Sequence, residues 1–234
     1  MSKQGPLRKL KQYLRRNKLA REGVKESLYI EKLELGQGSG AWICSLNGLT
    51  PASRIYSFGA GTDISFDLDV HARSGAEVHI FDPTPRSIEW IGQQQLPQGV
   101  SFHAYGIGAE DGSIEFYPPR RTTSSHFSPV RRYAGQQYGD PVQAPVYCLS
   151  SIMAMLGHDH VDMIKLDIEG GEFDVIEHLA DPGNGAGQLL IEFHHNYQTI
   201  PLSNTVNSFK KIENSGFHCF HISDRTYEMS FIRQ

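Results

Sequence analysis

Residues 55–82 read IYSFGAGTDISFDLDVHARSGAEVHIFD, and this stretch decides the fold. An apolar run enters Gly59-Ala60-Gly61, a short helical stretch follows, and a second apolar run stops at Asp82. Two glycines let the backbone turn tightly and let a ligand approach the main chain, while the following helix points its amide dipoles into the same space. An acid at the end of the next strand can accept hydrogen bonds from both hydroxyls of a ribose. The stretch therefore predicts half of a nucleotide-binding βαβ unit with an adenosine-type ligand, although such a turn can also be purely structural.

The turn departs from the dinucleotide-binding pattern at two positions. The third glycine of that pattern is replaced by Ile64, and an acid, Asp63, stands where a pyrophosphate would dock on the helix N-terminus. An anionic pyrophosphate would be repelled there, whereas S-adenosylmethionine carries a sulfonium and an ammonium and no phosphate. We therefore expect S-adenosylmethionine as cofactor and S-adenosylhomocysteine as product, with an NAD-dependent oxidoreductase as a rival.

A second motif-rich stretch extends from residue 146 to residue 195. It contains VYCLSSIMAMLGHDHVDMIKLDIEGGEFDVIEHL and, after a glycine-rich loop, QLLIEFHH. Apolar spacing predicts helices at 149–156 and from 173 onward, and strands at 161–168 and 189–193. Ligands bind at the carboxyl ends of strands in open parallel sheets, and four polar residues follow these strands: Asp167, Glu169, Glu192 and His194.

These motifs carry a family resemblance. In their order and spacing, YSFGAGTDISFD, HIFDP, IKLDIEGGEFDVI and LLIEFHH resemble the FkbM-type branch of the class I S-adenosylmethionine-dependent methyltransferases, from about Ile55 to the C-terminus. Ser124 and Ser125 also resemble a family feature. The resemblance implies a Rossmann-like α/β fold with a seven-stranded, mostly parallel sheet and an antiparallel C-terminal strand. It also implies methyl transfer, most often to a hydroxyl oxygen.

The remaining pattern fits an alternation of strands and helices. Further strands are predicted at 100–104, 113–117, 217–222 and 227–232, the last two forming a terminal hairpin. The spacing of Val206, Phe209 and Ile212 predicts a helix that Gly216 ends. Helices on both faces of the sheet are the natural packing for this pattern.

Length and composition predict one catalytic domain. The chain has 234 residues, of which 39% are hydrophobic, and a net charge of −4. We divide it into a basic N-terminal helical extension, 1–24, and a methyltransferase domain, 25–234. Three distant cysteines favour free buried thiols and a cytoplasmic location, and neither a membrane-spanning stretch, a signal peptide nor a nucleic-acid-binding motif is recognisable.

Two segments have open interpretations. In the extension, Leu7, Leu10 and Leu14 form an apolar stripe on a basic helix. We expect this stripe to pack on the domain as part of a lid; the alternative is a contact with an acidic partner, a nucleic acid or an anionic membrane. The segment 118–145 is rich in Pro, Ser, Thr, Gly, Arg and Tyr and is expected to be a flexible substrate-side loop. Its arginines could recognise an anionic substrate or simply be solvated: Arg120, Arg121, Arg131 and Arg132.

The cofactor site is predicted at the ends of the first three strands of the nucleotide-binding half. The glycine turn should contact the methionine and ribose, Asp82 the ribose, and Pro83 and Thr84 the adenine edge. The stretch 103–107 should contact the adenine, and Asp167 the ammonium. The predicted cofactor-binding residues are Phe58, Gly59, Ala60, Gly61, Asp63, Asp82, Pro83, His103, Gly106, Ile107 and Asp167.

The catalytic residues are predicted at the ends of the later strands: Asp167, His194, Glu192 and Glu169. A hydroxyl nucleophile must lose its proton, and His194 or Asp167 is the expected base, with Glu192 orienting the substrate. Glu169 and Glu172 could instead cap a helix, and the acids with His194 could hold a divalent cation, which we do not favour. The expected acceptor is a hydroxyl of a small molecule, sugar or natural product; a peptide or amide nitrogen and an inactive scaffold are alternatives.

Overall fold

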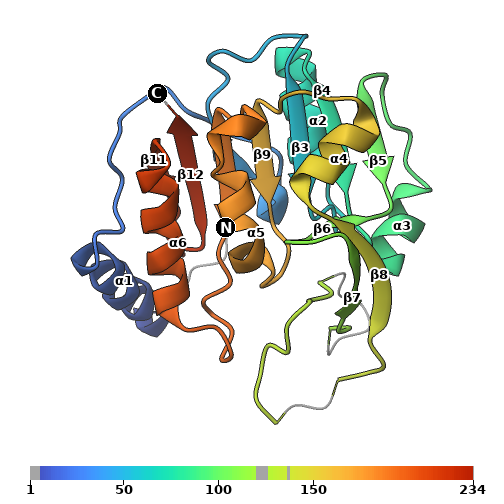
Figure 1. The fold of residues 1–234 in the computed structure, drawn as a ribbon. Helices are drawn as coiled ribbons and strands as arrows, with labels where there is room; N and C mark the ends of the chain where they lie inside the picture. The colour runs from blue at the N-terminus through green and yellow to red at the C-terminus, as the bar shows by residue number, and fades with distance from the viewer. Residues whose placement is uncertain (1–5, 120–125, 136–137, 234) are drawn as a thin grey trace.

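The protein is built on a central sheet of seven strands. The computed structural model describes residues 6–119, 126–135 and 138–233 (Figure 1). The strand order is β11-β12-β10-β9-β3-β4-β5, and every strand runs parallel to its neighbours except β12, which is antiparallel to both β10 and β11. The predicted α/β fold with an antiparallel C-terminal strand is confirmed. The strands are β3 (Arg54–Phe58), β4 (Glu77–Phe81), β5 (Val100–His103), β9 (Met163–Leu166), β10 (Gln188–Glu192), β11 (Phe217–Ile222) and β12 (Glu228–Arg233).

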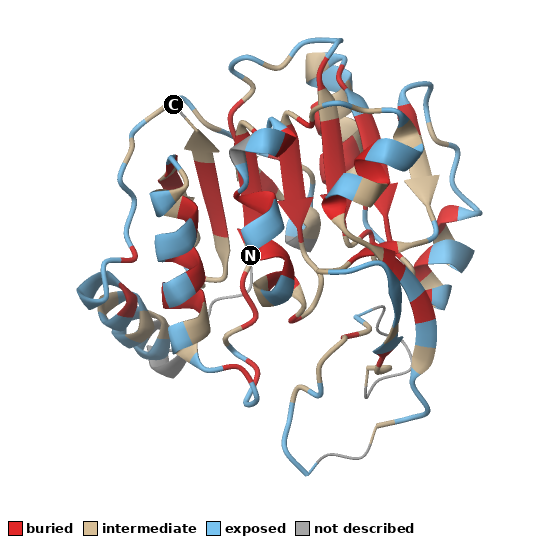
Figure 2. Ribbon diagram, in the orientation of Figure 1, coloured by how far each residue is buried: buried red, intermediate tan, exposed pale blue. Residues whose placement is uncertain are grey.

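Alternating side chains give the sheet two buried faces. Tyr56 and Phe58 of β3 point into one core, and Ile55 points into the other. The first core, which we call the α4 face, lies under α4 (Leu149–Leu156), α5 (Glu172–Leu179) and α6 (Leu202–Asn214); the second, the α2 face, lies under α2 (Ser65–Ser74) and α3 (Pro85–Ile91) (Figure 1). Burying a large apolar side chain stabilises the fold by about 1.5–3 kcal/mol, so the strands with both faces covered form its most stable part (Figure 2).

A short N-terminal hairpin extends the α2 face. Strands β1 (Leu33–Leu35) and β2 (Trp42–Cys44) pair antiparallel around the 3-10 turn η1 (Gly38–Gly40). The amide of Gly36 donates to Asp69 of α2 at 2.9 Å, so the hairpin is fixed to the helix that follows the glycine turn. This hairpin was not predicted from the sequence.

The basic N-terminal helix α1 (Pro6–Arg21) is attached at one edge of the sheet. Leu19 is buried in the α4 face, and the Arg15 guanidinium lies 4.5 Å from the centre of the Tyr227 ring. Leu10 and Leu14 are 53% and 57% exposed, so the expectation that the leucine stripe packs on the domain is wrong for these two residues. The side chain of Leu7 lies outside the described residues.

A second, small sheet stands beside the first. It has the order β6-β8-β7, formed by β6 (Gly106–Ile107), β7 (Gly112–Phe116) and β8 (Val142–Tyr147). The predicted loop 118–145 is therefore too long, because its last residues pair with β7. Pro145 was the misleading signal, and β8 accommodates it because β6 pairs only with Val146 and Tyr147. Arg120, Arg121, Ser124 and Ser125 lie outside the described residues.

A short turn and the three cysteines complete the fold. A 3-10 turn, η2 (Pro182–Asn184), precedes β10. Cys44 and Cys219 are buried free thiols as predicted, whereas Cys148 is only half-buried. Among the described residues, none of the helices combines the length and the apolar character needed to cross a bilayer.

Candidate active site

A cavity of about 850 Å³ lies at the carboxyl ends of the parallel strands. This volume falls within the range of small-molecule sites, roughly 300–1,000 Å³. The cavity brings together residues that are far apart in the sequence and that follow β3, β4, β9 and β10. Of the predicted site residues it is lined by Phe58, Gly59, Ala60, Gly61, Asp63, Asp82, Pro83, Gly106, Ile107, Asp167, Glu169 and Glu192, and also by Thr84.

Gly59 sits where two strands come closest. Its φ of +92° is a left-handed conformation that favours glycine, and a Cβ built on it would lie 1.8 Å from the carbonyl oxygen of Asp167. The Asp167 amide donates to the Phe58 carbonyl at 3.0 Å, which holds the two strand ends together. The glycine is therefore required for the close approach of β3 and β9 at the floor of the cavity.

Gly59→Ala is expected to destabilise the fold by several kcal/mol and to abolish cofactor binding, because the backbone of β9 must move to admit the methyl group. Gly23→Ala is the matched control: Gly23 has the same φ of +92°, but nothing lies within 4 Å of its added Cβ. Urea denaturation of both variants separates the clash from the backbone strain. Equal losses of stability in the two variants would show that the contact with Asp167 is unimportant.

Asp82 is the organising group of the glycine turn. One carboxylate oxygen accepts from the amides of Ala60 and Gly61 at 3.0 and 2.9 Å and from the Ser87 hydroxyl at 2.8 Å. The other accepts from the amide and the hydroxyl of Thr84 at 2.9 and 2.6 Å. A carboxylate offers about four lone-pair sites, so these five bonds occupy it. The predicted contact with a ribose therefore requires that hydroxyls replace some of these donors.

Asp63 lies at the start of α2, inside the cavity wall. Its carboxylate accepts from the Ser65 amide at 2.9 Å, and Ser65 is the first residue of the helix. An acid at a helix N-terminus is favoured by the helix dipole. The carboxylate therefore occupies the position where an incoming phosphate would otherwise bind.

His103 does not reach the cavity. Its ring nitrogen Nε2 lies 3.0 Å from Nδ1 of His79, and the ring points from β5 onto the α4 face of the sheet. The predicted contact of His103 with the adenine is therefore not supported. His103 is the last residue of β5, but its ring lies on the same face of the sheet as the Ser101 side chain.

Several cavity residues were missed by the sequence analysis. Lys165 is 4% exposed within β9 and donates to the Gly59 carbonyl at 3.1 Å. Asp67 on α2 is 1% exposed, and burial raises the pKa of its carboxyl while the charge of Lys165 lowers it. Polar residues inside otherwise apolar runs were the available signal for both. Gly40 and Trp42 also line the cavity, and they come from the hairpin that the sequence did not reveal.

Asp167, Glu192 and His194 meet at the other end of the cavity. One potential ligand atom from each, a carboxylate oxygen or an imidazole nitrogen, lies within 4.8 Å of those of the other two. His194 itself does not line the cavity but lies behind the carboxylates, 4% exposed. Asp167 Oδ1 is buried and makes no hydrogen bond within the described residues, and the His194 Nε2 atom lies 3.7 Å from it.

His194 is held as a cation. Its Nδ1 lies 3.3 Å from Glu172 Oε1, and its Nε2 lies 3.7 Å from Asp167 and 3.6 Å from Glu169. Burial alone would lower the pKa of this imidazole, but the charge of Glu172, its hydrogen bond and the charges of Glu169 and Asp167 together raise it to about 10. The expectation that His194 acts as a base near neutral pH is not supported, because its ring is protonated there.

Glu192, unlike His194, has a pKa close to neutral pH. Burial raises the pKa of its carboxyl, the charge of Asp167 raises it further, and His194 and Arg225 lower it, with the result at about 7. The pKa of Asp167 is raised as well, by burial and by Glu169. Such coupled acids share their titration, and a carboxylate that loses its proton near neutral pH is suited to accept one from a substrate.

Glu169 is anchored by three side chains that lie far from it in the sequence. His126 Nδ1 lies 2.5 Å from one oxygen, Arg132 donates to the other at 2.9 Å, and the Tyr197 hydroxyl donates to that same oxygen. Burial would raise the pKa of Glu169, but the hydrogen bond from His126 and the charges of His194, Arg132 and His126 hold it at about 2. Glu169 also has a φ of +56°, a strained conformation for a residue other than glycine. Glu169 is therefore a fixed charge at the cavity wall and not a proton acceptor.

Glu172 links the cluster to the start of α5. It is fully buried and accepts from the amides of Gly170 and His194 at 2.9 and 2.7 Å. Glu172 is the first residue of α5, but the N-cap Gly171 receives no side-chain hydrogen bond, so the suggested capping role is not observed. Glu172 instead orients His194, while Glu169 faces the cavity. Arg132 is bound to Glu169 and lies 4.9 Å from the Tyr197 ring, so it is not a solvated loop residue.

Known proteins are similar to this chain over most of its length. A family model described as "Methyltransferase FkbM domain" matches residues 57–229. The chain is 28% identical over 183 residues to "Probable methyltransferase-like protein 24" of Rattus norvegicus, covering 74% of this chain and 43% of that protein. It is 28% identical over 179 residues to the Homo sapiens protein of the same name, and this match covers 72% of this chain and 42% of that protein. The chain thus spans less than half the length of the curated relatives it matches.

A solved structure shares the fold. The crystal structure of methyltransferase FkbM from Methylobacillus flagellatus KT matches with a TM-score of 0.50 at 12% identity, over 79% of this chain and 44% of that one. This likeness concerns the fold alone, whereas the family model covers most of the sequence. On that match, the chain belongs to the FkbM methyltransferase family.

Proposed function

We propose that this chain transfers a methyl group from S-adenosylmethionine to a hydroxyl oxygen of a small molecule, sugar or natural product. The observation that carries the proposal is a single cavity that joins the glycine turn at one end to Glu192, with its pKa of about 7, at the other. Cofactor and acceptor can therefore be held side by side. Much of the acceleration in a displacement reaction comes from such positioning.

The charges in the cavity fit this cofactor. Its wall contains the carboxylates of Asp63, Asp82, Asp167, Glu169 and Glu192. A cofactor with a sulfonium and an ammonium suits this wall, whereas a pyrophosphate beside Asp63 does not. When bound, S-adenosylmethionine supplies an electrophilic methyl group. NAD-dependent oxidation is the weaker alternative for the same electrostatic reason.

The chain supplies the proton chemistry at Glu192. The acceptor hydroxyl gives its proton to the Glu192 carboxylate, and the His194 imidazolium and Arg225 keep the pKa of that carboxyl from rising further. Asp167 and Glu169 lie beside it as charged neighbours. In this proposal Glu192 takes the role of base that the sequence suggested for His194, and His194 lowers the pKa of Glu192.

We do not favour a divalent cation in this cluster, because the cation would first have to displace the proton of the His194 ring. The side chains of Asp167, Glu192 and His194 lie close enough to hold one, but the surrounding acids keep His194 charged. An amide nitrogen remains the alternative acceptor, and an inactive scaffold the alternative to catalysis. A cytoplasmic location is proposed from the buried free thiols of Cys44 and Cys219.

The acceptor class is tested by incubating the purified protein with methyl-labelled S-adenosylmethionine and a panel of acceptors. One half of the panel carries sugar and small-molecule hydroxyls, and the other half carries peptide side-chain amides. We expect label only in the first half. Label confined to the amides would replace the proposed acceptor, and label in neither half, despite cofactor binding, would favour the scaffold.

Asp82→Asn is expected to weaken S-adenosylhomocysteine binding by about 10- to 100-fold, because an amide in place of a carboxylate loses charge-assisted bonds to Ala60, Gly61 and Thr84. Calorimetric titration measures the affinity. Asp140→Asn, at an exposed carboxylate distant from the turn in sequence, is the control. An unchanged affinity in Asp82→Asn would remove this residue from the cofactor site.

A further inference from the structure

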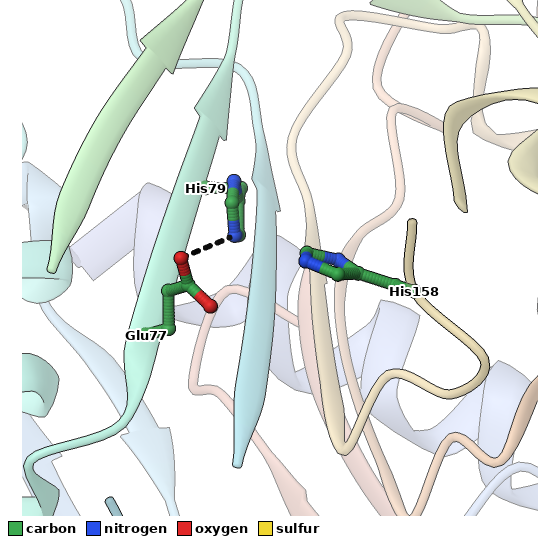
Figure 3. Close-up of side chains that lie close together, drawn as sticks. All are labelled: Glu77, His79 and His158. Atoms are coloured by element: carbon green, nitrogen blue, oxygen red, sulfur yellow. Dashed lines mark ion pairs between the residues drawn. The ribbon is translucent and has the colours of Figure 1, made fainter. Parts of the chain in front are cut away.

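A second cluster of ionisable side chains lies on the α4 face, outside the cavity. Glu77 and His79 project from β4 two residues apart, and His158 follows the end of α4 (Figure 3). One potential ligand atom from each lies within 4.8 Å of those of the other two. None of the three lines the cavity of the candidate active site.

The two histidines have their other ring nitrogens already bound. Nδ1 of His79 lies 3.0 Å from His103 Nε2 and 3.0 Å from the Ser101 hydroxyl, and Nδ1 of His158 lies 2.7 Å from the Tyr56 hydroxyl. These contacts leave Nε2 of each ring for another partner. A metal-binding histidine in proteins almost always has such a partner on its second nitrogen, which fixes the ring.

The His79 nitrogen that faces the cluster is buried and without a hydrogen bond. His79 is 5% exposed, and its Nε2 has no hydrogen-bond partner among the described residues. The nearest charged atom is Glu77 Oε1 at 3.4 Å, which Figure 3 shows as a dashed line. An unpartnered buried nitrogen costs free energy, so a ligand at this position would stabilise the fold.

The spacing suits a tetrahedral metal. Two ligand atoms at about 2.0–2.1 Å from zinc lie about 3.3 Å apart in a tetrahedron. The separation of His79 Nε2 and Glu77 Oε1 is 3.4 Å, and the ring of the half-buried His158 points toward them (Figure 3).

We propose that Glu77, His79 and His158 form a binding site for a divalent transition metal, best suited to Zn²⁺, with the fourth position left to water. Two imidazoles and one carboxylate are a known zinc ligand set. The metal would join β4 to the segment that follows α4, on the opposite side of β4 from α2. Its effect on the protein is to fasten this segment to the sheet.

The test uses the full chain without a histidine tag. Titration with Zn²⁺, and with Co²⁺ followed by its visible absorption, should show one site of tetrahedral character and a rise in melting temperature. Glu77→Gln and His158→Ala, both outside the fully buried core, should abolish this site. His103→Ala removes one of the two partners of His79 Nδ1 and leaves Ser101, and it should weaken the site by about 10-fold.

Two further variants make the result decisive. His178→Ala alters an exposed histidine of α5 and should leave Zn²⁺ affinity unchanged. Asp167→Asn alters the other group of potential ligands and should also leave it unchanged. Retention of the site in Glu77→Gln and His158→Ala, its loss only in Asp167→Asn, or the absence of any stoichiometric binding would each overturn the proposal.

Discussion

Replacing Glu192 by glutamine should lower kcat by about 10²- to 10⁴-fold, because glutamine keeps the shape of the side chain and cannot accept a proton. The affinity for S-adenosylhomocysteine should stay nearly constant, since the backbone of the glycine turn is untouched. The measurement is turnover with the most active hydroxyl acceptor of the panel, together with calorimetry. Glu177→Gln, at an exposed position of α5, is the control.

The pH dependence of kcat/KM in the wild-type enzyme should also identify Glu192 as the base. The pKa of Glu192 is about 7, and only the deprotonated form can act as base, so kcat/KM should rise with pH through an apparent pKa near that value. His194→Gln should move this apparent pKa upward, because the imidazolium lowers the pKa of Glu192. A Glu192→Gln enzyme with wild-type turnover, or a flat profile from pH 6 to 8, would show that another group takes the proton.

Replacing His194 by alanine should destabilise the fold by about 3–5 kcal/mol at pH 6, because it leaves several buried carboxylates without their cation. His194 is 4% exposed, and it lies within 3.3 to 3.7 Å of Glu172, Asp167 and Glu169. Urea denaturation measures the loss, with His178→Ala as the exposed control.

The loss should depend on pH in a defined direction. The pKa of His194 is raised from 6.5 to about 10 in the folded protein, so its charge stabilises the fold fully below pH 6.5. That stabilisation disappears as the pH rises through about 10. The free-energy difference between wild type and His194→Ala should therefore shrink from pH 6 to pH 10. A difference that is independent of pH would mean that His194 is neutral in the folded state.

The sheet could be predicted because its strands are buried on both sides. Runs such as Arg54–Phe58 and Gln188–Glu192 are almost wholly buried and have apolar centres, and Gly59 marks the turn after the first of them. Strand β8 could not, because the prolines around Val142 argue for a loop and only the pairing with β6 and β7 makes it a strand. Local sequence patterns fail to predict a strand where tertiary contacts determine whether the strand forms.

The candidate site also contains some residues that could be predicted from the sequence and others that could not. Residues that end a strand, such as Asp82, Asp167 and Glu192, could be placed from the sequence because strand ends meet at one edge of the sheet. The orientation of His103 and the contact of Arg132 with Glu169 depend on side-chain direction and on distant loops. The charge of His194 depends on three carboxylates gathering around it, which no spacing in the sequence reveals.

The central claim is that the cavity binds a sulfonium nucleoside for methyl transfer. Its most direct test is calorimetric titration of the purified protein with S-adenosylmethionine, S-adenosylhomocysteine and NAD. We expect one site for each of the first two and no heat with NAD, since Asp63 repels a pyrophosphate. Binding of NAD alone, or of none of the three, would contradict the account.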